Sequence, residues 1–261
     1  MIHNLRELYC YRELLFIIVW RDIKIKYKQS VMGFMWAIFM PMLIVSAGIL
    51  VKYAIATVSG KPMVFSEIVT VSVKALPWSF FVGSVRFATN SLMGNVNLVT
   101  KIYFPKEIFP IASVLSNLFD FIIAGCALGI ILIICQIGSS IYLLWLPMLM
   151  LTLLLLVIGL GMLLSALNLF FRDVKYIVEV LLTFGIFFTP VFYEVEMFGK
   201  WSKILLLNPV APILEAINAC VVYHRAPDFG WPAYSAAFSC LMFAFAYPVF
   251  KKLEPTFAES I

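Results

Sequence analysis

The sequence predicts an all-α integral membrane protein with six transmembrane helices, an N-terminal amphipathic interface helix and a re-entrant helical hairpin before the last span. The 261 residues are 63% hydrophobic and 13% charged, with a mean hydropathy of +1.02, whereas soluble domains are about half apolar and about a quarter charged. The apolar runs have the length of membrane helices, about 20 residues, rather than that of shorter barrel strands. Basic residues also concentrate in alternate connecting segments, as in multi-pass proteins.

The first predicted element is the amphipathic interface helix, within residues 1–30. Placed on a helix, Phe16, Trp20 and Tyr27 share one face with other apolar residues, and most charged residues lie opposite. The unbroken apolar core, 14–20, is too short to span a bilayer. We therefore expect the helix to lie along the inner membrane surface. Acidic residues near its start and the lack of a small-residue cleavage site argue against a signal peptide.

A dense charged run over 21–28 meets the apolar run that begins at Val31, so the junction near Ser30 sets a membrane boundary. Segments rich in Lys and Arg are retained inside, which predicts that this side is cytoplasmic. The predicted boundary residues are Arg21, Lys24, Lys28, Arg172 and Asp173. The last two could contact a partner or simply hold the boundary, and both interpretations stay open.

The membrane domain is predicted over 31–261, with spans at about 31–51, 68–92, 111–134, 143–167, 177–192 and 233–250. The second span contains Lys74, Arg86 and Asn90, so it should face the bundle interior or a water-filled path rather than lipid. Twelve Lys or Arg residues fall in predicted inner segments, six in outer segments and one in the membrane. This distribution favours six spans with both termini in the cytoplasm.

Arg86 and Asp120 are predicted to form a charge pair inside the membrane. At 1.5 Å per helical residue they lie roughly 14 and 18 Å from the inner ends of their spans. A deep charge needs a partner, and these two could neutralise each other within one subunit. Direct contact with a transported molecule is the alternative.

The region 194–223 breaks the pattern of long spans. Its apolar pieces, 204–207 and 211–223, are interrupted by Asn208-Pro209 and Pro212, and neither piece is long enough to cross a bilayer. Short, proline-interrupted helices between spans predict a re-entrant hairpin that enters from the outer side. A folded external cap is the alternative.

The sequence lacks the residue patterns of catalysis. It has no phosphate-binding G-x-x-x-x-G-K-[ST] loop and no G-x-S-x-G elbow, and its two histidines, His3 and His224, do not form a metal-binding pair. We expect no metal site and no covalent chemistry on this chain. Most of the net charge of +5 comes from inner segments, so it indicates no nucleic-acid partner. The energy for any uphill transport must come from a partner or an ion gradient.

Five stretches together resemble one family. They are RDIKIKYKQSVMGFMW at 21–36 with Pro41 following, NLVTKIYFPKEIFP at 97–110, NLFFRDV at 168–174, TPVFY at 189–193 and LNP at 207–209. In this order and spacing they are similar to the permease subunit of ABC-2 type polysaccharide exporters. That family exports lipid-linked O-antigen, teichoic acid or capsular polymer, and the resemblance covers nearly the whole chain.

The resemblance implies a homodimer in the lipid of a bacterial plasma (inner) membrane, bound to two copies of a cytoplasmic ABC ATPase. ATP and Mg would bind that partner, so this chain would be a transporter subunit without cofactors rather than an enzyme. The expected substrate is a lipid-linked polysaccharide, with O-antigen first. The alternatives are teichoic acid, capsular polymer or a small lipophilic compound. An ion-coupled transporter is a further alternative, but it should carry paired deep carboxylates, and only Asp120 is clearly deep.

The resemblance also implies a coupling helix between the second and third spans. A short helix that presses into an ATPase groove needs apolar anchors and a few charges. The predicted coupling residues are Asn97, Leu98, Lys101, Ile102, Phe104, Pro105 and Lys106. The alternative is an ordinary inner loop with the positive charge that such loops carry.

Aromatic residues are the predicted lining of a pore for the polymer, because rings stack on sugars weakly and repeatedly. The resemblance places the first and fifth spans along that pore. The candidates are Trp36, Phe39, Phe184, Phe187, Phe188 and Tyr193. Aromatic side chains also anchor membrane proteins at the interface, so packing against lipid or core remains the alternative for each one.

Overall fold

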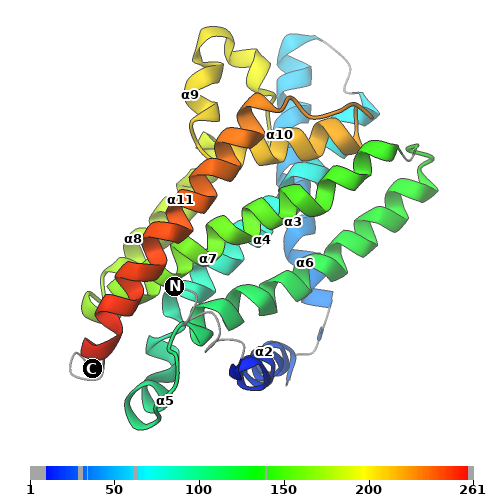
Figure 1. Ribbon diagram of the computed structural model, residues 1–261. Helices are drawn as coiled ribbons and strands as arrows, with labels where there is room; N and C mark the ends of the chain where they lie inside the picture. Colours follow the sequence, from blue (N-terminus) through cyan, green and yellow to red (C-terminus); the bar gives the residue numbers. More distant parts are fainter. Residues whose placement is uncertain (1–9, 29–31, 34, 61–63, 139, 258–261) are drawn as a thin grey trace.

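The structure is a computed structural model that describes residues 10–28, 32–33, 35–60, 64–138 and 140–257 (Figure 1). All regular secondary structure in these ranges is helical. The predicted all-α membrane class is therefore confirmed.

Five helices are long and apolar enough to cross a membrane. They are α3 (Met35–Ser59), α4 (Phe65–Asn90), α6 (Ile108–Ile134), α7 (Leu146–Phe170, preceded by η2, Ile141–Trp145) and α11 (Gly230–Leu253). These helices correspond to the first, second, third, fourth and sixth predicted spans. Residues 31 and 34, at the predicted start of the first span, lie outside the described residues.

The helix found at the fifth predicted span, 177–192, is too short to cross a membrane. It corresponds to the 12-residue helix α8 (Val174–Gly185) and the single turn η3 (Ile186–Phe188). Thr189 is extended and precedes Pro190, and a residue before proline is disfavoured in helical conformation. The described residues thus contain five helices of spanning length instead of the predicted six.

Helix α4 is the centre of the bundle and packs against α3, α6, α7 and α8. Its buried residues include Thr70, Lys74, Ser84 and Thr89. These polar side chains are tolerated because α4 faces protein on most sides. The predicted position in the bundle interior therefore holds for Lys74, whereas Arg86 is half-buried and Asn90 is exposed.

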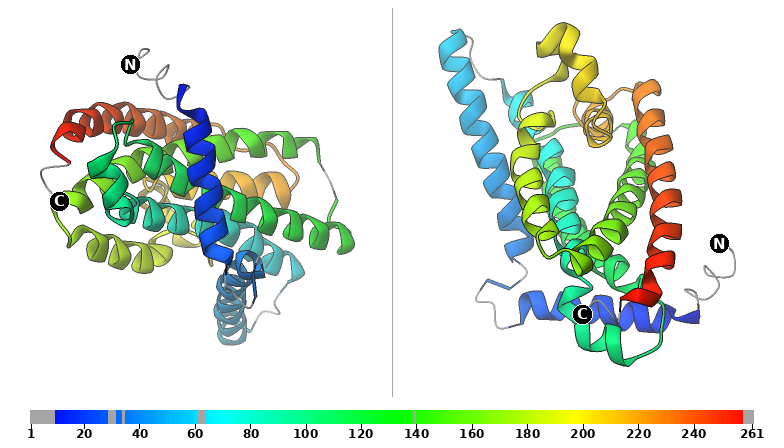
Figure 2. Two further views of the ribbon diagram at one scale, coloured as in Figure 1. Left: turned by 90° about the horizontal axis from the view of Figure 1, so that it is seen from below. Right: turned by 90° about the vertical axis from the view of Figure 1, so that its left-hand side faces the viewer.

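One end of the bundle carries α2 (Arg12–Tyr27), which lies crosswise beneath the spanning helices (Figure 2). The same end carries η1 (Met93–Asn95), α5 (Val96–Lys101) and the C-terminal turn η5 (Glu254–Thr256), and we call it the α5 end. Ile18 and Ile23 of α2 are buried, whereas Phe16 and Trp20 are exposed. The predicted single apolar face was therefore wrong in detail, because α2 packs on α6 with one side and leaves other apolar residues outward.

The opposite end, the α10 end, holds η4 (Val195–Trp201), α9 (Ser202–Leu206) and α10 (Val210–Val221). Asn208 and Pro209 separate α9 from α10, as expected from the sequence. Helix α10 lies across the bundle and is largely buried against α4, α7 and α11. The insertion of this region into a membrane stays a prediction.

Helices α7 and α11 approach each other closely because of Gly159. A Cβ atom at this position would lie 3.1 Å from the backbone nitrogen of Phe243. Small residues at helix crossings let membrane helices pack backbone to backbone. Near the α5 end the same two helices join an apolar cluster that includes Ile18, Phe104 and Phe250.

Candidate functional site

The predicted coupling segment forms η1, α5 and the loop into α6. Tyr103 is its most protruding residue, with 94% of its surface exposed, and Ile102 is 51% exposed. Asn97 and Lys101 are exposed, and Leu98 is half-buried. Sequence reasoning passed over Tyr103, although an aromatic residue beside Ile102 in a basic loop was a usable signal.

Phe104, Pro105 and Lys106 are buried within the chain, which favours a supporting role over direct contact, and their place among the coupling residues stays a prediction. The Phe104 ring packs on Phe109, with centroids 5.5 Å apart. Lys106 Nζ donates to the Ile102 carbonyl oxygen at 2.6 Å, and burial lowers the pKa of this amine. The chain turns inward here to begin α6, which leaves Tyr103 outside and carries Phe104 into the core.

Glu107 joins this loop to the last helix. Its carboxylate is fully buried, and Oε2 lies 2.8 Å from Lys251 Nζ. Burial raises the pKa of Glu107, and the Lys251 ammonium opposes that shift. The backbone N–H of Lys106 also donates to Glu254 Oε1 at 2.7 Å. The segment that carries the exposed coupling residues is therefore held by these contacts to the C-terminal end of α11.

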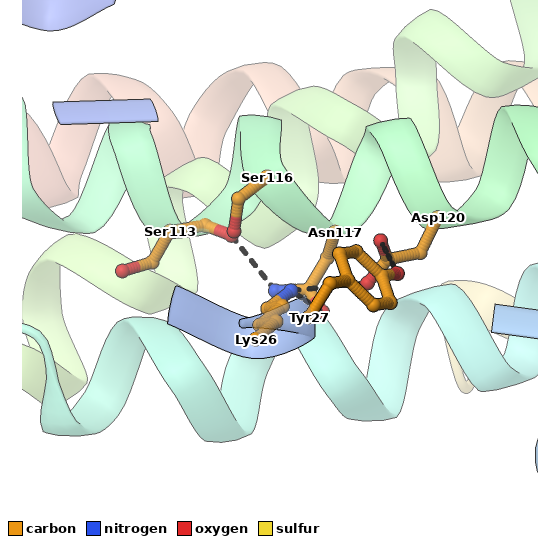
Figure 3. Close-up of polar contacts among 6 residues, drawn as sticks. All are labelled: Lys26, Tyr27, Ser113, Ser116, Asn117 and Asp120. Carbon is orange, nitrogen blue, oxygen red and sulfur yellow. Dashed lines mark hydrogen bonds and ion pairs between the residues drawn. The ribbon is translucent and has the colours of Figure 1, made fainter. Parts of the chain in front are cut away.

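A polar cluster holds α2 against α6. Lys26 Nζ donates to Asn117 Oδ1 and to Asp120 Oδ2, both at 3.0 Å. The Tyr27 hydroxyl donates to Asp120 Oδ1 at 2.5 Å, and the Asn117 amide donates to the Ser113 carbonyl oxygen (Figure 3). Burial lowers the pKa of Lys26 against the opposing charge of Asp120, and burial raises the pKa of Tyr27.

The predicted pair of Arg86 and Asp120 was therefore wrong. Asp120 binds Lys26 and Tyr27, while Arg86 forms a two-bond ion pair with Glu179 of α8, at 2.6 and 2.8 Å. Arg86 and Glu179 are 43% and 49% exposed. Helices α2 and α8 supplied the partners, and the comparison of depths along the second and third spans did not consider either helix.

A second deep pair joins α4 to α10. Lys74 is fully buried, and its Nζ lies 2.7 Å from Glu215 Oε1. Sequence reasoning identified neither Glu179 nor Glu215. Each is an isolated carboxylate in an apolar segment. A carboxylate in such a place needs a partner, so both residues could have been considered as partners for the basic residues of α4.

A cavity of about 530 Å³ lies between α2, α3, α4 and α6. Its polar lining includes Lys26, Arg86, Asn117 and Asp120, and Trp36 lines its α3 side. The cavity therefore combines the Lys26–Asp120 ion pair and the Arg86 side chain with aromatic and aliphatic walls.

The predicted pore aromatics come from two regions of the chain, α3 and the segment from α8 to Tyr193. Trp36 lines the cavity just described. The Phe39 ring packs edge-on against the Trp36 ring, with centroids 5.5 Å apart. Phe184, Phe187 and Phe188 are exposed on α8 and η3. Tyr193 is half-buried, and its hydroxyl donates to the Phe187 carbonyl oxygen at 2.9 Å. Their role as a pore lining stays a prediction.

The predicted boundary residues remain at the surface. Arg21 pairs with its neighbour Asp22 at 2.8 Å, and Lys24 is exposed, with Nζ 5.4 Å from the Trp20 ring centroid. Lys28, Arg172 and Asp173 are also exposed. This position is compatible with both the boundary and the partner-contact interpretations of Arg172 and Asp173.

At the α10 end, a larger cavity of about 710 Å³ lies between η4, α9, α10 and the start of α11. Its lining includes Glu194, Glu215, Asn218, Tyr223 and Trp231. Sequence reasoning did not identify this cavity, because its walls come from four separate segments.

We expect Asp120→Asn to loosen α2 from the bundle, because it removes the charge that binds Lys26 and Tyr27. Hydrogen bonds to charged groups contribute about 1.5–3 kcal/mol each, so amide hydrogen exchange in α2 should accelerate at least tenfold (about 1.4 kcal/mol). Mass spectrometry of the exchanged protein measures this. Asp22→Asn is the matched control, because surface ion pairs contribute about 0–1 kcal/mol. Equal exchange in the two variants would contradict the role assigned to Asp120.

Comparisons with known proteins agree with the resemblance drawn from the sequence motifs. Residues 13–222 match the model of the family described as ABC-2 type transporter. The chain is 31% identical to the O-antigen export system permease protein RfbA of Myxococcus xanthus, over 264 aligned residues that cover all of both chains. It is 26% identical to an RfbA permease of Klebsiella pneumoniae over 216 residues, which cover 82% of this chain and 81% of the relative.

Proposed function

The chain belongs to the ABC-2 type transporter family, and from this premise we propose that it is the permease of an exporter that moves lipid-linked O-antigen across the bacterial inner membrane. The observation that carries the proposal is the similarity over the full length of both chains to the Myxococcus xanthus O-antigen export permease. Five helices of spanning length make the chain a multi-pass membrane protein, as this role requires.

ATP hydrolysis on a separate cytoplasmic subunit, present in two copies, is part of the proposal. The exposed side chains of Ile102 and Tyr103 support it, because an apolar and an aromatic residue at the tip of a loop are typical anchors for a protein partner. Asn97 and Lys101 are exposed on the same segment and would supply polar contacts around them. The basic residues at the α5 end favour a cytoplasmic position for this end and for both termini.

A second copy of the chain is also part of the proposal. Arg86 and Glu179 form an exposed ion pair between α4 and α8, both within the apolar body of the molecule. An ion pair facing lipid is costly, whereas one beside a water-filled path or a second subunit is tolerated. Exposed Phe184, Phe187 and Phe188 continue this face along α8 and η3. A homodimer joined at this face would place the ion pairs and rings of both copies along a shared polymer route.

The direct test of the function is genetic complementation. A strain that lacks the gene for this chain should accumulate lipid-linked polymer inside the cell and lose O-antigen from its surface. The chain, expressed with its ATPase, should restore surface O-antigen on a lipopolysaccharide gel. Restored export of a teichoic acid, a capsular polymer or a small lipophilic compound instead would overturn the assignment of the substrate.

We expect Phe187→Ala combined with Phe188→Ala to slow O-antigen export several-fold while ATP hydrolysis by the complex persists. The reason is that stacking on each ring is modest, so loss of two rings weakens guidance of the polymer without touching the ATPase. Surface O-antigen per cell and ATPase rate are the two measurements. Phe238→Ala combined with Phe245→Ala is the matched control, since these exposed rings lie on α11, on another side of the bundle. Equal export by both double variants would count against a route along α8.

A further inference from the structure

We propose that the cavity at the α10 end is a binding subsite for a short, uncharged segment of the exported glycan. This inference rests on the proposed function and adds a recognition site to it. The cavity, about 710 Å³, falls within the range of about 300–1,000 Å³ that is usual for small-molecule sites. It lies at the end of the molecule opposite the coupling loop, so a polymer would meet it after crossing the membrane.

Asn218 supplies the first observation. This residue of α10 lines the cavity and is 1% exposed, yet its Oδ1 atom has no hydrogen-bond partner among the described residues. A buried amide oxygen without a partner costs free energy, and native proteins usually satisfy such groups. A sugar hydroxyl that entered the cavity could donate to this oxygen.

The carboxylates of the cavity are held in place by neighbouring groups. Glu215 Oε1 binds the fully buried ammonium group of Lys74 at 2.7 Å, which fixes the carboxylate while the residue still lines the cavity. Glu194 Oε1 accepts a hydrogen bond from the Tyr223 hydroxyl at 3.3 Å. Each ionised carboxylate has two oxygens that accept hydrogen bonds, so acceptor capacity remains for sugar hydroxyls.

An aromatic wall completes the site. Trp231 lines the cavity, and its ring packs edge-on against Tyr234 with centroids 6.0 Å apart. The Tyr234 hydroxyl in turn donates to the Leu207 carbonyl oxygen, which anchors this pair to the end of α9. A rigid aromatic surface beside fixed acceptors suits a sugar ring, which has an apolar C–H face and hydroxyls around its rim.

The charge of the lining selects against acidic polymers. Lys74 neutralises Glu215, and Arg225 supplies one further positive charge. The remaining acidic lining residues are Glu194, Glu196 and Asp228. The excess of negative charge would repel phosphate or uronic acid groups. Within the described residues, no three acidic, His or Cys side chains are placed to hold a metal ion, so a bound cation is not the function favoured here.

The test uses the permease with its ATPase in lipid nanodiscs. The probe is O-polysaccharide released by mild acid from the lipopolysaccharide of the strain that encodes the chain and cut to short fragments. Binding is measured by saturation-transfer NMR and by calorimetry. Asn218→Leu and Trp231→Ala should each weaken binding about tenfold, the effect of losing one hydrogen bond or one stacking contact. Trp201→Ala is the matched control, because this exposed tryptophan of η4 lies outside the cavity lining.

A purely structural role for Asn218 predicts a different result. Because its Oδ1 has no described partner, Asn218→Leu should keep or raise the thermal unfolding temperature, whereas a structural amide would lower it. Unchanged fragment binding in Trp231→Ala, or equally tight binding of an oligogalacturonate of the same length, would overturn the proposal. The proposal would also be overturned if the chemical repeat unit of the exported glycan carried phosphate or uronic acid. These outcomes leave the function intact if the wild-type chain still restores O-antigen export, and failed complementation would instead refute the function.

Discussion

Glu215→Ala is expected to lower the free energy of unfolding by about 3–5 kcal/mol, because it leaves a buried Lys74 without its partner. Lys74 is 0% exposed, and its described ion pair is the 2.7 Å contact with Glu215. Thermal unfolding of the purified protein in detergent measures the effect. The variant should unfold at a clearly lower temperature and accumulate to a lower level in the membrane.

A double variant separates this mechanism from general damage to α10. Replacing both members, as Lys74→Met with Glu215→Leu, removes the buried charge together with its partner, and apolar replacement of a buried ion pair is often neutral or stabilising. Much of the lost stability should therefore return. Glu196→Ala is the control, since this exposed carboxylate lines the same cavity. A double variant less stable than Glu215→Ala alone would show that the pair does not act as described.

Ile102→Ala combined with Tyr103→Ala is expected to abolish export while the protein still folds and inserts. These side chains are 51% and 94% exposed, so their loss removes little intramolecular packing. Anchor residues at protein interfaces contribute about 2 kcal/mol or more each, so the loss of both should lower affinity for the ATPase subunit by about several hundredfold. Binding of the purified ATPase to the permease in nanodiscs measures this loss, and thermal unfolding checks that the fold is intact.

Phe104→Ala provides the contrast for this prediction. Phe104 is buried beside Phe109, and truncation of a buried Phe costs about 3–5 kcal/mol. This variant should unfold more easily, and correctly folded protein should still bind the ATPase. If Phe104→Ala instead reduced ATPase affinity without a loss of stability, the assignment of the contact surface to Tyr103 would be wrong.

The secondary structure followed from local properties of the sequence. Long apolar runs bounded by charged segments identified α3, α4, α6, α7 and α11, because the helix length needed to cross a bilayer is set by its thickness. The proline breaks likewise predicted the short helices at the α10 end. The fifth span was overestimated because the Phe-rich segment stays apolar after its helix has ended at Gly185.

The choice of charge partners depended on the tertiary structure. Depth along a span placed Arg86 and Asp120 at similar levels, but it carried no information on which way each helix turns its side chains. In the folded chain, α8 brings Glu179 to Arg86, and α2 crosses beneath the bundle to bring Lys26 to Asp120. Ion pairing requires contact within a few ångströms, and that distance depends on helix rotation and packing rather than on sequence position.

At the coupling loop, too, the sequence predicted the composition of the segment, and the tertiary structure determined which of its side chains are buried. By itself, the sequence determined that 97–106 is a short, basic and apolar segment between two long helices, because composition is a local property. Only the tertiary structure decided that Phe104 enters the core and Tyr103 stays outside, because the chain turns inward between these two residues to begin α6. Which of the two points inward depends on the apolar surface that Ile18, Phe109 and Phe250 bring together from three separate helices.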